Sequence, residues 1–370
     1  MNTRSLIKLP AELQMMVMSF LSQHDLAVST RVCRLWNALF NAVLWRNVRY
    51  HSNMGGAANF LCRTDPFMQC VKNGALMNNG HFIQSLHLEM NYIYMDSFLE
   101  GCPDYFPQLT SIWIEGVKRA EEEDFAELLD LCPAGLKTLV YCSRDPTGME
   151  FDFGKVAVDA VVAHAATLEV LRIEGKHVGG GFNGSIDRLM RSLPNLKELN
   201  FATNRLEFGT GGMDATRISK STSGWVCNNL EVLGFQIYKV PRPDITRTIA
   251  DCPASDYTIL GTTEESLSLQ RQVYSKLGKL TKLRELRLGY KGRLPSFNHG
   301  RIKRDYVRQF DCLAMTLESG LDLLKDLKEL RVVELYHMEV GINNDAEKEW
   351  VARNWPHATV GTTSHEGYYE

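Results

Sequence analysis

The sequence lacks the features that mark secreted, membrane-spanning and metal-binding proteins. Its first ten residues, MNTRSLIKLP, contain no apolar run of the length that a signal peptide needs, and no stretch reaches the roughly 18 apolar residues of a membrane span. The nine cysteines are odd in number and include no C-x-x-C pair, which favours neither a disulfide framework nor a zinc ribbon. We therefore expect an intracellular protein, in the cytoplasm, the nucleus or both, with reduced thiols and no bound metal.

The sequence also has little net charge of either sign. The 41 Lys and Arg residues nearly balance the 44 Asp and Glu residues, so the formal net charge is only -3. Such a chain has no general attraction to nucleic acid or to anionic lipid, and we expect neither as a partner. With 370 residues, 44% of them apolar, it is long enough to form two or three domains or one elongated repeat array.

Motifs for common enzyme chemistry are absent as well. There is no Walker A, G-x-S-x-G or H-E-x-x-H motif, and the ten histidines show no metal-ligand spacing. Gly179-x-Gly181-x-x-Gly184 follows a strand pattern as a dinucleotide fingerprint would, but the next strand pattern ends in Thr203-Asn204 instead of an acidic ribose ligand. We interpret these glycines as a loop that needs no cofactor, and we keep a nucleotide-binding enzyme as an alternative.

What the sequence does have is an N-terminal segment with more apolar residues than it can bury. Of the 43 residues from 6 to 48, 26 are apolar. Pro10 suits the first turn of a helix, and apolar residues then recur at helical spacing over 11–21. The stripe that we expect to face the core consists of Leu13, Met16, Val17, Phe20 and Leu21.

Met15 and Met18 fall outside that stripe. A second helical pattern covers 32–40, and Asp25 and Leu26 lie in the expected connection between the two. A unit of about forty residues rarely buries so many apolar side chains, so the surplus must dock on the rest of the chain or on another protein.

The segment LPAELQMMVMSFLSQHDLAVSTRVCRLWNALFNAVLWRNV resembles an F-box along its full length. The resemblance depends on an ordered set of residue types: Leu9-Pro10, Glu12-Leu13, Phe20-Leu21, Asp25-Leu26, Val32-Cys33, Trp36 and Leu44-Trp45. In that family a three-helix unit binds a Skp-type adaptor, which connects it to a cullin scaffold in an SCF ubiquitin ligase. The adaptor-binding residues that the resemblance implies are Leu9, Pro10, Leu13, Val17, Leu21, Leu26, Val32, Cys33, Trp36, Leu44 and Trp45.

From residue 83 onward the pattern L-x-x-L-x-L recurs eight times. The copies begin at residues 83, 109, 136, 168, 196, 230, 283 and 330. Most spacings are close to the 20–29 residues of leucine-rich repeats, in which each unit is a short strand and a return segment. The two longest gaps contain helical patterns, EESLSLQRQVYSKLGKL and YVRQFDCLAMTLESGLDLL, whereas 208–224 lacks apolar periodicity and is expected to be a loop.

The repeats resemble the irregular leucine-rich repeats that follow F-boxes in fungal families, and the ending KEWVARNWPHATV resembles their terminal cap. The resemblance and the periodicity together predict an N-terminal all-α three-helix F-box at 6–48, a linker region at 49–80, and an α/β leucine-rich-repeat solenoid at 81–370. The solenoid is expected to be a horseshoe with an inner parallel sheet and outer helices.

Side chains on a strand alternate between the two faces of a sheet, so the repeat pattern also predicts which residues face solvent on the concave side. One row should contain His87, Trp113, Val140, Arg172, Asn200, Gly234, Arg287 and Glu334, and the next row Glu89, Glu115, Cys142, Glu174, Ala202, Gln236, Gly289 and Tyr336. An exposed Trp beside acidic residues would suit a ligand with Lys or Arg near an apolar residue. The expected substrate-binding residues are His87, Glu89, Trp113, Glu115, Arg172 and Glu174.

The function that these predictions imply is a non-catalytic substrate receptor of an SCF-type ubiquitin ligase. Its partners would be a Skp-type adaptor, a cullin bound indirectly, and a protein substrate that the sequence does not name. The alternative from another class is a repeat scaffold that uses the adaptor contact without ubiquitination.

Overall fold

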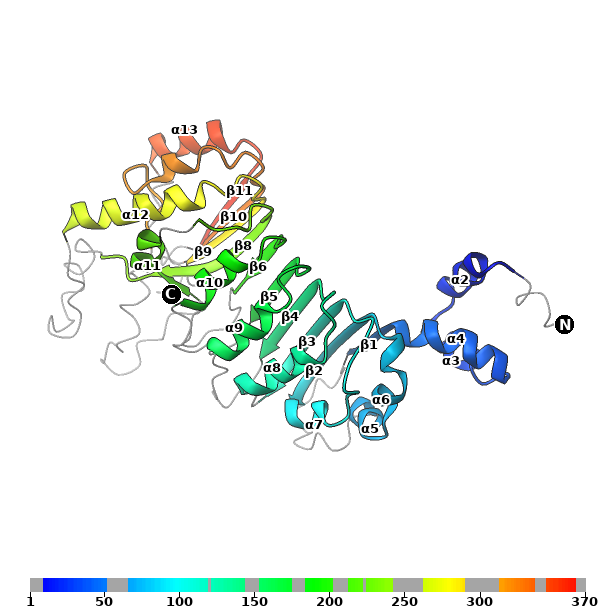
Figure 1. Ribbon diagram of the computed structural model, residues 1–370. Coiled ribbons are helices and arrows are strands. Elements are labelled where there is room, and N and C mark those ends of the chain that lie inside the picture. The colour runs from blue at the N-terminus through cyan, green and yellow to red at the C-terminus, as the bar shows by residue number, and fades with distance from the viewer. Residues whose placement is uncertain are drawn as a thin grey trace, which may run out of the picture.

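The computed structural model describes residues 9–51, 66–118, 121–143, 153–174, 184–201, 212–221, 224–241, 262–289, 313–336 and 344–363. A small helical unit at the N-terminus projects from one end of a long parallel sheet, and the strands then follow one another in chain order along the molecule (Figure 1). No helix in these ranges is long and apolar enough to cross a membrane.

Three helices form the N-terminal unit. Helix α2 (Ala11–Ser19) begins after Pro10, α3 (Gln23–Ser29) begins after Ser22, and α4 (Arg34–Arg46) is the longest. The Ser22 hydroxyl accepts a hydrogen bond from the Asp25 amide at 3.1 Å, which caps α3 and makes Ser22–Asp25 its first turn. The segment of Asp25 and Leu26, expected to be a connection, is therefore a helix of its own.

The described strands all run parallel. In spatial order, β1 to β6 are followed by β8 to β11, and the short β7 pairs only with the end of β8. Their bounds are β1 Asn47–His51, β2 Ser85–Tyr94, β3 Ser111–Lys118, β4 Thr138–Ser143, β5 Val170–Glu174, β6 Glu198–Asn200, β7 Gly212–Asp214, β8 Val232–Tyr238, β9 Glu285–Gly289, β10 Val332–Tyr336 and β11 Thr359–Thr363. Each of the eight recurrences of L-x-x-L-x-L supplies one of these strands.

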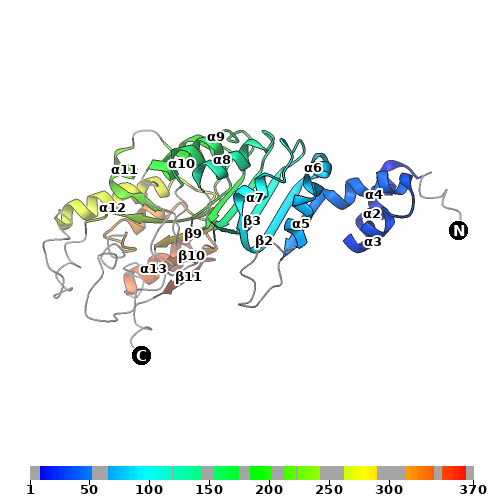
Figure 2. The same cartoon turned by 90° about the horizontal axis from the view of Figure 1, so that it is seen from below.

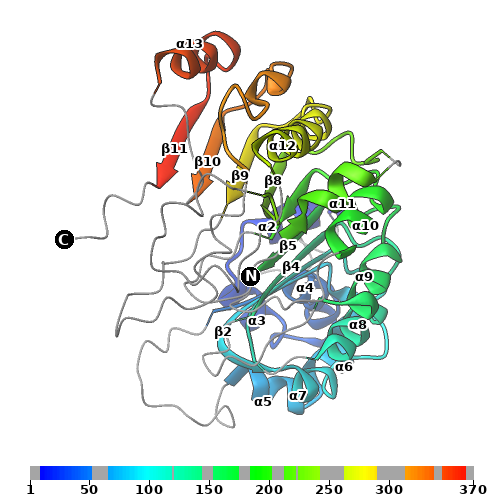
Figure 3. The same cartoon turned by 90° about the vertical axis from the view of Figure 1, so that its left-hand side faces the viewer.

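The return segments place helices on the outer side of the sheet, as Figure 3 shows from the end of the molecule. These elements are α5 Pro66–Lys72, α6 Ala75–Asn79, η2 Gly80–Phe82, α7 Met95–Leu99, α8 Glu122–Asp130, α9 Lys155–Val162, α10 Ser185–Ser192, α11 Ala215–Lys220, α12 Thr263–Leu277, η5 Leu321–Leu324 and α13 Asp345–Asn354. The arrangement resembles a leucine-rich-repeat solenoid, as the sequence predicts.

One continuous core lies between the sheet and these outer helices. Alternation along β3 illustrates how it forms, because Ile112 and Ile114 are fully buried while Trp113 between them is half-buried on the opposite face. Neighbouring return segments are also tied by polar contacts. The carboxylate of Glu122 on α8 accepts a hydrogen bond from the Ala157 amide in the first turn of α9 at 2.7 Å.

Three segments differ from the expectation. Strand β1 and helices α5 and α6 lie within or reach into 49–80, where the sequence shows no clear pattern. The segment 208–224, expected to be a loop, contains β7 and α11, because Asp214 caps α11 with its carboxylate and Met213 and Ile218 are buried. Residues 313–320, which lie within the second of the two helical patterns, form turns and not a helix.

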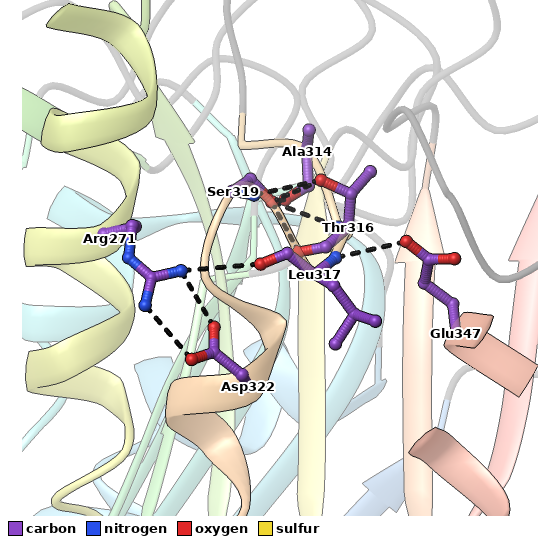
Figure 4. A network of polar contacts seen from close by, with 7 residues as sticks. All are labelled: Arg271, Ala314, Thr316, Leu317, Ser319, Asp322 and Glu347. Atoms are coloured by element: carbon purple, nitrogen blue, oxygen red, sulfur yellow. Dashed lines mark hydrogen bonds and ion pairs between the residues drawn. The ribbon is translucent and has the colours of Figure 1, made fainter. Parts of the chain in front are cut away.

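The turn at 313–320 is stabilised by polar contacts in place of helical ones (Figure 4). The Ser319 hydroxyl donates to the carbonyl oxygen of Ala314 at 2.5 Å, and the Ser319 amide donates to the Thr316 hydroxyl at 3.1 Å. Glu347 of α13 accepts a hydrogen bond from the Leu317 amide at 3.3 Å. These side chains satisfy backbone groups that an α-helix would otherwise pair, which explains why the helical pattern in the sequence is misleading here.

Candidate functional site

The first candidate site is an apolar surface on the solvent side of α2. Its four large apolar side chains are exposed, and Phe20, just after the helix, is 82% exposed. They recur at helical spacing and so share one side of α2. We call this surface the α2 stripe, and it consists of Leu13, Met16, Val17 and Phe20.

This result corrects the predicted orientation of the helix. The stripe was expected to face the core with Met15 and Met18 outside it, whereas Met18 is 1% exposed and Met15 packs against the same small core. The reason is that α3 and α4 pack on the Met18 side of α2, where Leu26 and Phe40 complete a core separate from that of the solenoid. A large apolar surface is thus left in solvent, which is typical of an interaction site.

The adaptor-binding residues that the F-box resemblance implies differ in how far they are exposed to solvent. Pro10, Leu13, Val17, Val32 and Cys33 are exposed, and the half-buried ones are Leu9, Leu21, Trp36, Leu44 and Trp45. Leu26 is the exception: it is 5% exposed and belongs to the core of the helical unit, so its assignment to the adaptor surface is corrected. Sequence reasoning left out the exposed Met16, Phe20, Val28 and Leu35, of which the first two lie on the predicted stripe.

The second candidate site lies on the concave face of the sheet, and the strand register forms the predicted row there. His87 pairs with Trp113, Trp113 with Val140, and Val140 with Arg172. The same row continues through Asn200, Gly234, Arg287 and Glu334, but Asn200 and Val140 are buried and do not face solvent as expected. The register thus places His87, Trp113 and Arg172 on one face of neighbouring strands, as the alternation predicts.

Trp113 lies at the centre of a stack of side chains from β2, β3 and β5. Its ring lies 4.9 Å from that of His87 with 19° between the planes, and the Arg172 guanidinium carbon lies 5.5 Å from its centroid. Arg172 can reach it because the residue on the intervening strand is the short Val140, which the stack covers and leaves only 1% exposed. Glu198 orients Arg172 through contacts of 3.0 Å to Nε and 2.6 Å to Nη2.

The stack changes the interpretation of Trp113. A substrate cation was expected to stack on the indole, but Arg172 of the chain itself already makes that cation–π contact. The indole Nε1 donates to Glu115 at 2.5 Å. What the protein presents to a ligand is therefore a fixed platform of imidazole, indole and guanidinium, not an open aromatic face.

Acidic residues form the next row. Glu89 and Glu115 pair in register, and Glu174 follows on β5 after Cys142; the side chain of Glu174 lies outside the described atoms. Carboxylates on neighbouring strands are about 5 Å apart at the backbone, so their charges repel each other. Glu89 also contacts the neighbouring strand β1, where His51 Nδ1 lies 2.7 Å from one of its carboxylate oxygens.

Residues 6–51 match the F-box-like family model. This segment is an F-box-like domain. Among solved structures, a leucine-rich-repeat protein of Leptospira interrogans is similar at 15% identity, over 78% of this chain and 80% of that chain, with a TM-score of 0.21. The solenoid is assigned from the register of its own parallel strands. No curated protein matches the chain.

The F-box-like domain is joined directly to the solenoid. Its last helix, α4, ends at Arg46, and β1 begins at Asn47 and pairs with β2. The Arg46 carbonyl oxygen accepts a hydrogen bond from the Gln84 amide at 2.8 Å, and Asn41 donates to the Asn79 side chain at 2.9 Å. Because the family match extends to residue 51, the domain and the first strand of the sheet share one continuous segment.

Three further features bear on chemistry: groups of potential metal ligands, the glycine loop and the cysteines. No group of three or more His, Cys, Asp or Glu side chains in the described ranges could hold a metal ion. Gly179 and Gly181 lie outside the described residues, and Gly184 precedes α10 as its N-cap. Burial raises the pKa of the Cys132 and Cys227 thiols to about 12, which keeps them protonated and unreactive.

Proposed function

We propose that the protein is a substrate receptor of an SCF-type ubiquitin ligase, acting in the cytoplasm, the nucleus or both. The F-box-like domain would bind a Skp-type adaptor through the α2 stripe, and the adaptor would connect it to a cullin. The observation that carries the proposal is the apolar α2 stripe, which the domain's own core leaves uncovered. The protein itself would perform no bond-making step.

The receptor role would depend on proximity. A substrate held on the sheet is brought close to the conjugating enzyme on the cullin, which raises the effective concentration for ubiquitin transfer. Such an effect requires a defined geometry between the two sites. The direct continuation of α4 into β1 supports it, because the described segment contains no spacer between the F-box-like domain and the sheet.

Co-purification tests the adaptor and cullin contacts. The full-length chain should co-purify with a Skp-type adaptor and a cullin. Leu13→Asp, which changes an exposed residue of the α2 stripe, should co-purify with neither. Recovery of the adaptor without cullin would favour the alternative, a scaffold that uses the adaptor contact without ubiquitination. Equal recovery of the adaptor with the parent and with Leu13→Asp would contradict the F-box function.

For substrate recognition we propose the concave face around His87, Glu89, Trp113, Glu115, Arg172 and Glu174. Since Arg172 already occupies the indole, a basic substrate side chain would approach the acidic row instead, while an adjacent apolar side chain lies along the stack. A peptide with Lys or Arg next to an apolar residue is the suitable probe.

The binding of such peptides can be measured by fluorescence anisotropy. Glu115→Lys should weaken binding, and the effect should shrink as salt screens the charges. Glu123→Lys is the matched control, because Glu123 is an exposed residue of the outer helix α8. If both variants bind the peptide as the parent does, the concave acidic row is not the recognition surface.

A further inference from the structure

A cleft on the outer side of the solenoid, away from both proposed binding surfaces, has an unusual lining. It lies between α11 and α12 and has a volume of about 600 Å³. Among the described residues that line it, none carries a carboxylate, and apart from the amide of Gln272 the side chains are hydroxyls and cations. These side chains are Ser219, Ser268, Ser275, Arg271, Lys276 and Lys279.

Arg271 is held in place at one end of the cleft. Its two terminal nitrogens contact the two carboxylate oxygens of Asp322 at 2.9 and 3.0 Å, as Figure 4 shows. This bidentate pair fixes the plane of the guanidinium, and it contributes N–H groups to the cleft at no net charge. The net positive charge of the cleft therefore comes from the two lysines.

Lys276 is held in place as well. Its ammonium group donates to the carbonyl oxygens of Ile218 and Ser221, the latter at 2.6 Å, and so closes the C-terminal end of α11. An ammonium has three N–H donors, so one remains for a ligand. Burial lowers the pKa of Lys276, and the neighbouring cations Lys279 and Arg191 lower it further while Asp187 opposes them. A bound anion would offset both causes.

Lys279 supplies the second charge. Within the described part of the chain, its ammonium group makes no hydrogen bond or ion pair with any carboxylate. Lys279 follows α12 four residues after Ser275 and lines the same cleft, so it can turn toward a ligand there without breaking another contact.

We propose that the α11–α12 cleft binds an oxyanion of the phosphate class, held by Lys276 and Lys279 with a hydrogen bond from the Ser275 hydroxyl, which precedes Lys276 on α12 and lies four residues before Lys279. A phosphate carries more charge than a carboxylate and accepts bonds on three or four oxygens, which suits two ammonium groups and a hydroxyl at the C-terminal end of α12. The cleft is larger than a bare phosphate, so the group would be either a phosphomonoester on a protein side chain or part of a free phosphate compound.

The test measures saturable binding to the full-length chain by isothermal titration calorimetry at constant ionic strength. The probes are inorganic phosphate, a phosphoserine peptide and the same peptide without phosphate. Lys279→Glu should weaken phosphate or phosphopeptide binding at least about tenfold, since it reverses one charge beside a divalent anion. Ser275→Asp, which adds a carboxylate to the cleft and removes no cation, should weaken it similarly.

Lys282→Glu is the matched control. Lys282 is an exposed lysine three residues further on, outside the lining, and it contacts Asn229 at 2.6 Å. It changes the net charge of the protein by the same amount and should alter binding less than about twofold. Circular dichroism melting curves establish that each variant is folded.

The pattern of binding across the probes and variants distinguishes a specific site from diffuse attraction. Binding of either phosphate probe that Lys279→Glu loses and Lys282→Glu keeps supports it, and the tighter probe identifies the source as a phosphorylated side chain or a free phosphate. Equal losses in the two lysine variants would show that only diffuse charge attracts the anion, and the proposal would then be wrong. It is equally wrong if neither phosphate probe binds more tightly than the unmodified peptide.

Discussion

Two valines of nearly equal exposure allow a matched test of the α2 stripe. Val17 on α2 is 40% exposed and Val156 on the outer helix α9 is 42% exposed. Val17→Asp and Val156→Asp make the same chemical change at the same degree of burial. If the α2 stripe is an adaptor interface, only the first variant should lose adaptor affinity, because only the first residue becomes desolvated in the complex.

The size of the effect follows from two contributions. Covering the exposed part of Val17 would contribute about 0.5–1 kcal/mol, since full burial of such a side chain is worth about 1.5–3 kcal/mol. A carboxylate in the same place must be desolvated without a partner, which costs at least about 1–3 kcal/mol more. Val17→Asp should therefore weaken binding by at least about 1.5 kcal/mol, or roughly tenfold, and Val156→Asp by less than about 0.5 kcal/mol.

Binding of the purified adaptor to the full-length variants can be measured by surface plasmon resonance. Melting curves are needed beside it, because loss of affinity counts only if Val17→Asp remains folded. The α2 stripe lies outside the small core around Met18, so the free energy of unfolding of Val17→Asp should be close to that of the parent. If the two variants bind the adaptor within a factor of about three of each other, the stripe is not the adaptor interface.

The remaining predictions concern stability. His164 is buried, and desolvation is the main cause that lowers its pKa, so on acidification the unfolded state binds a proton before the folded state does. The free energy of unfolding should therefore fall below pH 6.5 by up to about 1.4 kcal/mol per pH unit, and it should fall less steeply in His164→Gln. Denaturant titrations at pH 7.5 and 5.5 measure this difference. A Cβ at Gly278 would lie 2.4 Å from a backbone carbonyl oxygen of η5, so Gly278→Ala should cost about 1–3 kcal/mol, while Gly135→Ala, with open space around it, should be near neutral in the same unfolding assay. A double-mutant cycle of Trp113→Ala and Arg172→Ala should give a coupling free energy of about 0.5–1 kcal/mol, and a value of zero would mean that the stack is only a geometric coincidence.

The sequence predicts the strands of the solenoid well because their pattern is repeated. Each L-x-x-L-x-L copy must bury its leucines in the same shared core, so position and register are both determined by side-chain alternation. The row from His87 through Trp113 to Arg172 could therefore be named from the sequence. The contact between Trp113 and Arg172 could not, because it spans two strands and depends on how short Val140 is.

The orientation of α2 shows a different limit. Apolar spacing reveals that Leu13, Met16 and Val17 share one side of a helix, but it does not reveal which side the neighbouring helices cover. In a helix that is apolar nearly all round, Met15 and Met18 form an equally good inner side, and α3 and α4 pack there. Only tertiary packing decides between the two. Tertiary packing also decides the structure of 208–224. This segment has too few apolar residues for its pattern to predict β7 and α11, although the burial of Met213 and Ile218 is enough to anchor both elements.

The two proposed surfaces belong to one mechanical unit, and this shapes what the protein can do. Backbone hydrogen bonds connect the entries of the described strands from Gln84 to Thr359, apart from the short β7, and this ladder begins at Arg46, the last residue of α4. A displacement of the F-box-like domain would therefore have to break the pairing of β1 with β2 or the contact between Asn41 and Asn79. Since each repeat contacts chiefly its neighbours, bending is spread over the solenoid and is not concentrated at the junction. A ligand on β2 and β3 would thus be held at a fixed distance from the adaptor surface, whereas a ligand near β10 would inherit the accumulated flexibility of the intervening repeats. The stack around Trp113 lies on β2 and β3, at the end of the sheet nearest the F-box-like domain (Figure 2), so a ligand there would be positioned most accurately relative to the proposed adaptor surface.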